Sequence, residues 1–288
     1  PALLHRNGIK LDQLEAYYSP VFDALLCWPQ VPQLITCHYL TPLVASNSRK
    51  AWLRYRLWQP RHCRVATRLI AISRYVADQL VQIGVEAERI EVIPNGIYIQ
   101  RPPVLVPSSQ DLVAIARHDV NKNLAALFRG IDQLQRQWPQ WHGTLRIIGR
   151  CGRQTPLVRR LHRALPNPEQ VCLIDALPQA ELIALLRSSL ALLSASTEEG
   201  FDYPVLEAKA EGIPTLISDI PVHREFHQGS SLLFPTDDDG TALAGQVRAL
   251  LGDSSLWLHL SRAGLGVARS LNVEVQTAHI DAQLKSVS

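Results

Sequence analysis

Carboxylates and cations gather at two places in the sequence, and their spacing suits the binding of a phosphorylated sugar. Glu199 and Glu207 flank the segment 200–206, whereas Arg117 and Lys122 lie close together much earlier in the chain. Each oxygen of a carboxylate accepts a charge-assisted hydrogen bond, so carboxylates are suited to gripping sugar hydroxyls. Two cations at one junction can neutralise a diphosphate and stabilise it as a leaving group. Together these residue types suit a ligand that joins a diphosphate to a sugar.

The two carboxylates belong to the segment 196–208, which follows the apolar run Leu190–Ser194 and leads into a helical pattern. Pro204 is expected at the first helical position, where its missing N–H costs nothing, and Glu207 in the first turn, near the positive helix end. Gly200 lets the backbone come close to a ligand. A helix N-terminus at the carboxyl edge of a parallel sheet binds nucleotides, although acidic capping of the helix is an alternative explanation.

Short apolar runs rich in β-branched residues alternate with segments of helical period along the chain. The expected strands are Leu34–Cys37, Arg68–Ile72, Ile90–Ile93, Leu112–Ala116, Leu145–Gly149, Val171–Ile174, Leu190–Ser194, Thr215–Ser218 and Ser231–Phe234. One expected helix face comprises Leu124, Leu127, Phe128, Ile131 and Leu134, and another comprises Leu182, Leu185 and Leu186. This alternation predicts an α/β protein with doubly wound parallel sheets covered by helices on both faces.

The segment Arg101–Ser109 breaks this rhythm, because its three prolines and paired serines mark a linker. We therefore expect a first domain at residues 1–100, a linker at 101–110 and a second domain at 111–270, with the last segment, 271–288, packing back on the first domain. About three strands precede the linker, which is too few for a typical sheet of this class. The first domain is therefore expected to be incomplete. The sequence contains no Met, and we expect its first residue to be an internal point of a longer protein.

The composition excludes several classes of protein. With 288 residues, 47% of them hydrophobic and 19% charged, the chain is long enough for two domains and too apolar to be disordered. No stretch approaches the ~18 uninterrupted apolar residues of a membrane helix. The five cysteines are odd in number and no pair has C-x-x-C spacing, so neither a disulfide framework nor a zinc site follows. Reduced thiols, and hence a cytoplasmic protein, are expected.

A basic stretch from Arg49 to Arg74 stands out because no Asp or Glu occurs from Ala24 to Ala77. Its cations are Arg49, Lys50, Arg54, Arg56, Arg61, Arg64, Arg68 and Arg74, and Trp52, Tyr55 and Trp58 lie among them. Such a stretch could face an anionic membrane surface, a phosphorylated acceptor or nucleic acid. A solvated helix face beside an anion-binding cleft is the alternative. Of these partners we retain peripheral contact with the inner face of a membrane, and we expect no nucleic acid.

Together the two segments resemble the retaining GT-B glycosyltransferases of the group 1 family, glycosyltransferase family four. That family has a basic Arg/Lys pair, here Arg117 and Lys122, followed by an E-x7-E motif, here Glu199 to Glu207. The segment Ile93–Ile97 also resembles the family's Pro-Asn-Gly turn before the linker. The resemblance implies the GT-B fold, which consists of two Rossmann-like doubly wound domains facing a cleft.

The resemblance also implies a role for each matching residue. Arg117 and Lys122 would hold the donor diphosphate, and His38 matches a family histidine that lines the reaction centre. The residues expected to bind the transferred sugar and the ribose are Glu199, Gly200, Phe201, Asp202, Tyr203, Val205, Leu206 and Glu207. Of these, Glu199 is expected to position the sugar beside His38 in catalysis. The pair Asp202-Tyr203 departs from the Gly-Leu of many members, which would alter how the sugar is held.

Two further patterns are expected to be structural. The run Asp237–Asp239 contains the D-x-D metal motif of the other glycosyltransferase fold, but it precedes Gly240, so a solvated turn or helix start is expected. The pair Gly149 and Gly152 lacks the remaining glycines of a dinucleotide-binding G-x-G-x-x-G loop, which argues against a dehydrogenase. We therefore expect neither a metal nor a cofactor.

The resemblance implies transfer of a hexose from a nucleoside diphosphate sugar to an acceptor hydroxyl, with retention of anomeric configuration by front-side attack. The expected acceptor is a saccharide or a lipid-linked molecule in polysaccharide, glycolipid or cell-envelope glycan synthesis. The alternatives are a nucleotide-sugar epimerase of the same fold and a non-catalytic fragment that binds a nucleotide sugar. Replacement of Arg117 or Lys122 is expected to weaken donor binding with little loss of stability.

Overall fold

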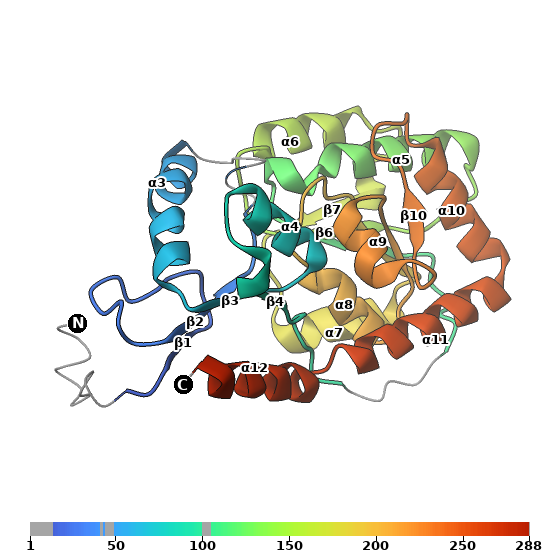
Figure 1. Ribbon diagram of the computed structural model, residues 1–288. Coiled ribbons are helices and arrows are strands. Elements are labelled where there is room, and N and C mark those ends of the chain that lie inside the picture. The colour runs from blue at the N-terminus through green and yellow to red at the C-terminus, as the bar shows by residue number, and fades with distance from the viewer. Residues whose placement is uncertain (1–13, 41–42, 44–48, 100–104, 288) are drawn as a thin grey trace. The chain divides into compact units, whose positions relative to one another are not determined.

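The computed structural model describes residues 14–40, 43, 49–99 and 105–287. The chain forms two compact units: the first comprises Pro1–Gly96 and Val273–Ser288, and the second Ile97–Asn272. Residues 101–104 of the expected linker lie outside the described residues. Each unit contains one parallel sheet, of four strands in the first and six in the second (Figure 1). The two parallel sheets confirm the α/β fold class.

The sheets are built almost entirely from the expected apolar runs. The first, in the order β1-β2-β3-β4, consists of β1 (Tyr17–Ser19), β2 (Gln33–Cys37), β3 (Arg68–Ala71) and β4 (Ile90–Val92). The second, in the order β10-β9-β8-β5-β6-β7, consists of β5 (Leu112–Ile115), β6 (Leu145–Ile148), β7 (Val171–Ile174), β8 (Ala191–Ser194), β9 (Thr215–Ser218) and β10 (Leu232–Phe234). Only β1 was not expected, because its Tyr-Tyr-Ser sequence is too short and too polar to form an apolar run.

The first unit has helices from both ends of the chain. They are α3 (Arg49–Val65), α4 (Arg74–Gln82), the 3-10 helix η2 (Ala87–Arg89) and α12 (Val273–Val287). Helix α12 packs against β2, where Val287 joins Leu34 in a small hydrophobic cluster. Arg68 Nη1 donates to Gln283 Oε1 over 3.1 Å, which ties the same helix to β3. The last segment of the chain is therefore part of the first unit.

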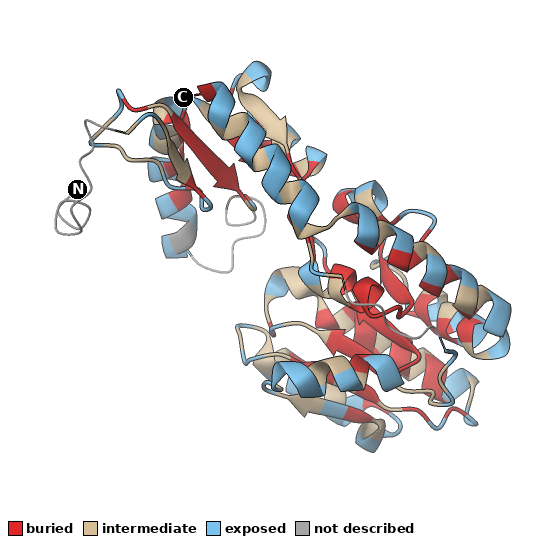
Figure 2. Ribbon diagram, turned by 90° about the horizontal axis from the view of Figure 1, so that it is seen from below, coloured by how far each residue is buried: buried red, intermediate tan, exposed pale blue. Residues whose placement is uncertain are grey.

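The second unit is a sheet between two layers of helices. Its helices are η3 (Val120–Lys122), α5 (Leu124–Gln137), α6 (Thr155–Ala164), η4 (Pro168–Gln170), α7 (Gln179–Ser188), α8 (Tyr203–Ala210), α9 (Pro221–His227), α10 (Thr241–Gly252) and α11 (Ser254–Ser270). Helices α5, α6 and α10 lie on one side of the sheet, and α7, α8 and α11 on the other (Figure 1). The buried strands run through the middle (Figure 2). Among the described helices of either unit, none is long and apolar enough to cross a membrane.

The order of the second sheet creates a switch point between β5 and β8. From β5 the chain proceeds to β6 and β7 on one side, returns to β8 on the other side of β5, and continues to β9 and β10. The chain therefore leaves β5 and β8 at the same edge of the sheet, and the helices that follow, α5 and α8, lie on opposite sides of it. A ligand in an open α/β sheet binds in the crevice at such a point.

Candidate functional site

The loops after β5 and β8 touch each other, although they are far apart in the sequence. The backbone N–H of Thr197 donates to the carbonyl oxygen of Asn121 over 2.8 Å. The side-chain amide of Asn121 donates in return to the carbonyl oxygen of Glu198 over 3.3 Å. Because β5 and β8 are parallel neighbours, their carboxyl ends bring the basic segment and the E-x7-E segment to one place.

Lys122 lies at the centre of this contact and is shared by two carboxylates. Its Nζ is 2.5 Å from Glu199 Oε1 and 3.7 Å from Asp202 Oδ1. The three side chains are 20%, 13% and 1% exposed, respectively. Burial opposes the charge on Lys122, but the two carboxylates outweigh it and raise the pKa of the lysine. Burial and the charge of Asp202 raise the pKa of Glu199 as well.

Asp202 is held on its other side by Ser194 and His223. Ser194 Oγ donates to Asp202 Oδ2 over 2.5 Å, and His223 Nε2 lies 3.1 Å from the same oxygen. His223 is fully buried, and its Nδ1 is 2.8 Å from the carbonyl oxygen of Ser218. Burial favours the neutral form of Asp202, but Lys122 and His223 outweigh it and hold the pKa of the carboxyl well below its usual range.

The backbone is strained at the end of each loop. Asn123 (φ 43°) and Asp202 (φ 66°) are the two non-glycine residues with positive φ in the described part of the chain. Asn and Asp tolerate this conformation best, and such residues cluster at functional sites. Asp202 precedes α8 but makes no side-chain cap on that helix, because its carboxylate is bonded to Ser194 and His223. The positive end of α8 therefore lacks a side-chain cap from Asp202 and can receive an anion.

Helix α8 begins one residue earlier than expected. It starts at Tyr203, so Pro204 is the second helical residue and Glu207 lies in the second turn, with no acid in the first. The expectation that Glu207 lies in the first turn was therefore wrong, because the left-handed Asp202 ends the loop and starts the helix. Glu207 is half-buried, and burial together with the charge of Asp202 raises its pKa.

Most of the remaining residues of the motif are buried. Phe201 is buried and packs edge-to-face on Tyr203, with ring centroids 5.3 Å apart. Val205 and Leu206 are completely buried, so neither side chain can face a ligand. Gly200 is also buried, whereas Tyr203 is 41% exposed.

Arg117 belongs to the same loop as Lys122 but lies outside the buried cluster. Its side chain is 63% exposed, and its Nε is 3.4 Å from Asp119 Oδ2. A Cβ atom at Gly149 or Gly152 would collide with the backbone of the loop 116–119. The two glycines therefore allow the loop after β6 to press on the loop that carries Arg117, which gives this pattern a packing role.

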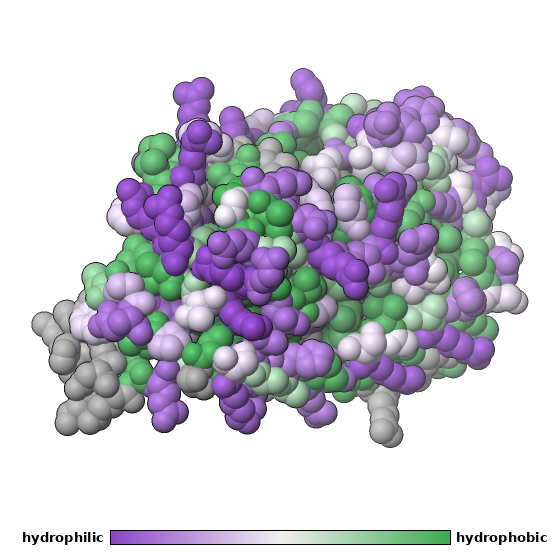
Figure 3. Space-filling view, viewed as in Figure 1, coloured by the Kyte–Doolittle hydropathy of each residue, from purple (hydrophilic) through white to green (hydrophobic). Residues whose placement is uncertain are grey.

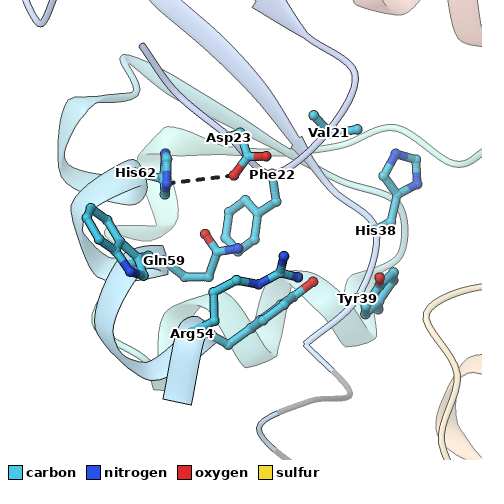
Figure 4. A pocket seen from close by; sticks show the side chains of 10 residues that line it. Val21, Phe22, Asp23, His38, Tyr39, Arg54, Gln59 and His62 are labelled. Atoms are coloured by element: carbon cyan, nitrogen blue, oxygen red, sulfur yellow. Dashed lines mark ion pairs between the residues drawn. The ribbon is translucent and has the colours of Figure 1, made fainter. Parts of the chain in front are cut away.

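His38 belongs to the first unit, at the carboxyl end of β2. Its Nε2 is 2.8 Å from the carbonyl oxygen of Pro20. It lines a cavity of about 420 Å³, called here the first-unit pocket (Figure 4). The lining residues are Val21, Phe22, Asp23, His38, Tyr39, Arg54, Tyr55, Trp58, Gln59 and His62.

The acidic run Asp237–Asp239 starts a helix, as expected. Asp238 accepts hydrogen bonds from the backbone N–H groups of Gly240 and Ala242, each over 3.0 Å, and Asp239 accepts one from Thr241 over 3.0 Å. These acids therefore satisfy the first N–H groups of α10. Within residues 14–40, 43, 49–99 and 105–287, no group of three or more His, Cys, Asp or Glu side chains could hold a metal ion.

Ser194 and His223 were missed from the sequence. The available signal was Asp202 itself, which stands where a glycine is common in the family. A carboxylate at a buried position needs polar partners. The partners of Asp202 are Ser194 at the end of β8 and His223 near the start of α9. Sequence spacing could not identify His223, because only the parallel pairing of β8 with β9 brings the start of α9 beside the loop after β8.

Comparisons with known proteins agree with this geometry. The chain is 25% identical to an O-antigen chain mannosyltransferase, RfbU, of Salmonella typhimurium over 215 residues, which cover 72% of this chain and 58% of that protein. It is 25% identical to a lipopolysaccharide 1,6-galactosyltransferase of the same organism over 209 residues, which cover 65% and 56% of the two chains. The chain thus spans little more than half the length of these relatives.

Solved structures show the same fold. The structure of Anabaena Alr3699/HepE in complex with UDP and glucose superposes with a TM-score of 0.78 over 99% of this chain and 80% of that chain, at 18% identity. An α,α-trehalose-phosphate synthase (UDP-forming) from Burkholderia vietnamiensis superposes with a TM-score of 0.72 over 99% and 75%, at 15% identity. At such low identity the likeness shows the fold alone.

Two family models divide the chain between them. The model of Glycosyltransferase Family 4 matches residues 1–101, and the model of Glycosyl transferases group 1 matches residues 109–253, about half of the chain. The second match contains Arg117, Lys122, Glu199 and Glu207. The chain therefore belongs to the group 1 glycosyltransferases, glycosyltransferase family four, which have the GT-B fold.

Proposed function

We propose that this chain is part of an enzyme that transfers a hexose from a nucleoside diphosphate sugar to an acceptor hydroxyl with retention of anomeric configuration. The observation that carries this proposal is the buried cluster in which Lys122 lies between Glu199 and Asp202, at the switch point of a parallel sheet. Relatives named as mannosyl- and galactosyltransferases support a hexose as the transferred group.

Binding of the donor would rearrange the partners of Lys122. A diphosphate brings additional negative charge to a site where one lysine already serves two carboxylates. Lys122 would therefore turn from Glu199 to the phosphate, and the exposed Arg117 would supply the second cation. This exchange frees Glu199 to bind the hydroxyls of the sugar. Because burial and the charge of Asp202 already raise the pKa of Glu199, the loss of Lys122 as its partner would raise that pKa further.

The chemical step needs no covalent intermediate on the protein. In front-side attack, the bond between the anomeric carbon and the phosphate oxygen breaks as the bond to the acceptor oxygen forms on the same face. The proton of the acceptor hydroxyl passes to the departing phosphate. Arg117, Lys122 and the N-terminus of α8 would stabilise the charge that develops on the leaving group. Glu199 and Glu207 would position the sugar and the ribose. His38 would have the catalytic role that its match to the family histidine implies.

A thermal-shift screen of nucleoside diphosphates tests the donor site, because a ligand of the folded state raises stability by mass action. We expect one of ADP, GDP, UDP or TDP to raise the melting temperature of the 288-residue chain. Incubation of the full-length protein with the matching sugar nucleotide then separates the activities. A transferase consumes the donor rapidly only with an acceptor, an epimerase converts the sugar without one, and a binding module does neither. Absence of any nucleotide effect would contradict the proposal.

We also propose that the acceptor is presented at a membrane surface, through contact with helix α3. This helix exposes Trp52, Leu53 and Leu57, each 38% to 51% accessible. Arg56 and Arg61 lie over tryptophan rings of the same helix, with guanidinium-to-centroid distances of 5.4 and 5.3 Å. Hydrophilic and hydrophobic side chains are interspersed over this region (Figure 3). Exposed aromatic and cationic side chains suit the surface of an anionic membrane.

The cysteines support a cytoplasmic location for this reaction. All five belong to the described residues, and all are free thiols. Cys37 is buried, and burial raises the pKa of its thiol above its ordinary value, so it is held as an inert core side chain. Free thiols are typical of a reducing compartment.

A further inference from the structure

The first-unit pocket is formed by three segments that meet at the carboxyl end of the first sheet. The segment Val21–Asp23 follows β1, His38 and Tyr39 follow β2, and the remaining lining side chains come from one face of α3 (Figure 4). The cavity measures about 420 Å³. That volume lies within the range of small-molecule sites.

The wall that follows β1 is fixed in place by buried hydrogen bonds. Gln33 is fully buried; its Oε1 accepts from the N–H of Leu25 over 2.7 Å, and its Nε2 donates to the carbonyl oxygen of Trp28 over 2.9 Å. The N–H of Ala24 donates to His62 Nδ1 on α3 over 2.8 Å. The pocket is therefore preorganised, which lowers the entropic cost of binding a ligand.

One polar group inside the pocket lacks a partner. Gln59 is 94% buried, and within the described part of the chain its Oε1 has no hydrogen-bond partner. A buried amide oxygen without a partner is unfavourable, so a position of this kind calls for a donor from a ligand. Sugar hydroxyls are such donors. The rings of Tyr39 and Trp58, which are 47% and 50% exposed, offer flat apolar faces for a pyranose ring.

Charge is divided between two ends of the pocket. Asp23 Oδ1 faces His62 Nε2 over 3.7 Å at one end, and Arg54 extends its guanidinium from the other (Figure 4). Arg54 lies over the ring of Tyr55 at 5.5 Å, and no ion pair joins it to a carboxylate among the residues that the structure describes. The one acid among the described residues that line the pocket, Asp23, lies at the other end with His62, so the guanidinium is available to an oxyanion.

We infer that the first-unit pocket binds a saccharide that carries a carboxylate or a phosphate group, with Arg54 on the oxyanion, Gln59 on a hydroxyl, and Tyr39 and Trp58 against the sugar ring. Under the proposed function, this saccharide is the acceptor of the hexose. The carboxylate of Asp23 lies with His62 and away from Arg54, so it can accept from a hydroxyl at the neutral end of the sugar.

Titration of the full chain with three sugars, followed by protein NMR, tests this inference. The probes are glucose, glucuronate and glucose 6-phosphate, with inorganic phosphate as the fourth ligand. We expect at least one charged sugar to bind about fivefold more tightly than both glucose and phosphate, a gain typical of a partly exposed ion pair. The tighter of the two charged sugars identifies the oxyanion as a carboxylate or a phosphate.

Three variants locate the effect. Arg54→Gln should abolish the advantage of the charged sugar, whereas Arg64→Gln, an exposed cation of the same helix outside the pocket, should retain it. Gln59→Met should weaken all three sugars by a similar factor. Equal binding of glucose and the charged sugars, equal binding of phosphate alone, or an unchanged advantage in Arg54→Gln would overturn the inference, as would no binding of any sugar.

These results are separable from the test of the proposed function. The nucleoside diphosphate screen reports on the second unit, which contains Lys122 and Glu199, whereas the preference for a charged sugar that Arg54→Gln removes reports on the first unit. Loss of the charged sugar's advantage in Arg54→Gln, with an unchanged nucleotide response, would support both ideas. A normal nucleotide response without sugar binding would overturn the pocket assignment alone.

Discussion

At the residue scale, Lys122 connects most of the candidate donor site. Its ammonium group joins the loop after β5 to two carboxylates of the loop after β8. Its removal would leave Glu199 buried beside Asp202 without the cation that the two carboxylates share. The structure therefore changes the expectation that this lysine could be replaced with little loss of stability, whereas the expectation is retained for the exposed Arg117.

We predict that Lys122→Ala weakens binding of the nucleoside diphosphate and also lowers the free energy of unfolding. The lost charge-assisted contact should be worth about 1.5–3 kcal/mol, or roughly 10- to 150-fold in affinity. The stability loss should be about 2 kcal/mol, because Glu199 can take up a proton and relieve part of the repulsion. Calorimetric titration and urea unfolding measure the two effects.

Arg117→Ala serves as the matched variant. Its side chain is 63% exposed, so it should weaken nucleotide binding without a measurable change in unfolding. Wild-type nucleotide affinity in both variants would remove the diphosphate role from this pair.

Asp202 should make the free energy of unfolding depend on pH in the acidic range. The pKa of its carboxyl is depressed in the folded state, so the folded state gains stability from its charge at pH values above the unfolded pKa near 4, and loses that stability as pH falls further. We predict that Asp202→Asn is less stable than wild type at pH 7. The difference in unfolding free energy between the two proteins should become smaller below about pH 4. Urea unfolding at several pH values measures this.

Asp281→Asn is the control for Asp202. Its carboxylate is 57% exposed and pairs with Lys285 on α12, so it should change stability little at any pH. A constant difference between Asp202→Asn and wild type across the whole range would contradict the role given to the buried carboxylate.

At the element scale, helix α8 carries a buried lysine two residues after the end of the E-x7-E motif. Lys209 is 1% exposed, its Nζ donates to Ser230 Oγ over 2.5 Å, and its stem packs near Gly264 of α11. Burial lowers the pKa of Lys209 to about 7. Below pH 7 the charged lysine must be held in the interior, so it costs stability there.

We predict that Lys209→Met stabilises the protein below pH 7 and that the gain disappears as pH rises above about 10. Between these values the unfolded state binds a proton that the folded state lacks, so wild-type stability rises by up to about 1.4 kcal/mol per pH unit. Denaturant unfolding from pH 6 to 10 measures the slope. Lys285→Met, at an exposed site, should leave the dependence of unfolding free energy on pH as steep as in wild type. A lower stability of Lys209→Met than of wild type at pH 6 would refute the prediction.

The acids before α10 should act as helix caps. Asp238→Ala removes acceptors for two backbone N–H groups, so it should cost about 1 kcal/mol of stability. Nucleotide binding should not change.

Excess chelator should leave most of the activity of the full-length enzyme. A complete loss of activity that manganese or magnesium restores would instead make Asp237 and Asp239 metal ligands.

At the scale of the whole molecule, we predict that the protein attaches to anionic membranes. We expect the chain to sediment with vesicles that contain anionic phosphatidylglycerol and to stay in solution with neutral phosphatidylcholine. Each basic residue near the surface contributes about 1 kcal/mol, so the double variant Arg56→Gln/Arg61→Gln should reduce partitioning roughly 30-fold.

Removal of two cations from α6 provides the charge-matched control. Arg160→Gln/Arg163→Gln changes the net charge equally, and both side chains are exposed in the second unit. A similar loss in this control would show that net charge, rather than α3, governs binding. Equal sedimentation with both kinds of vesicle would argue against electrostatic docking altogether.

The sequence by itself determined strands β2 to β10 and indicated which segments form the candidate site. Buried parallel strands must be continuous apolar runs, so β2 to β10 could be predicted within a residue or two, whereas the three polar residues of β1 could not. The E-x7-E segment and the basic pair were found because carboxylates and cations at these spacings suit a sugar and a diphosphate, and because they match the family's motif. These are local properties of the chain, and a local pattern is enough to predict them.

Only the tertiary structure decided which groups neutralise one another. The pairing of β5 with β8 brings Lys122 to Glu199, and that of β8 with β9 brings His223 to Asp202. Such contacts depend on strand order, which the sequence pattern does not specify. The first-unit pocket, with its unpartnered Gln59, likewise arises from segments that have no common motif. Charge balance and cavity shape depend on distances in space, so they follow from the folded chain and not from spacing along it.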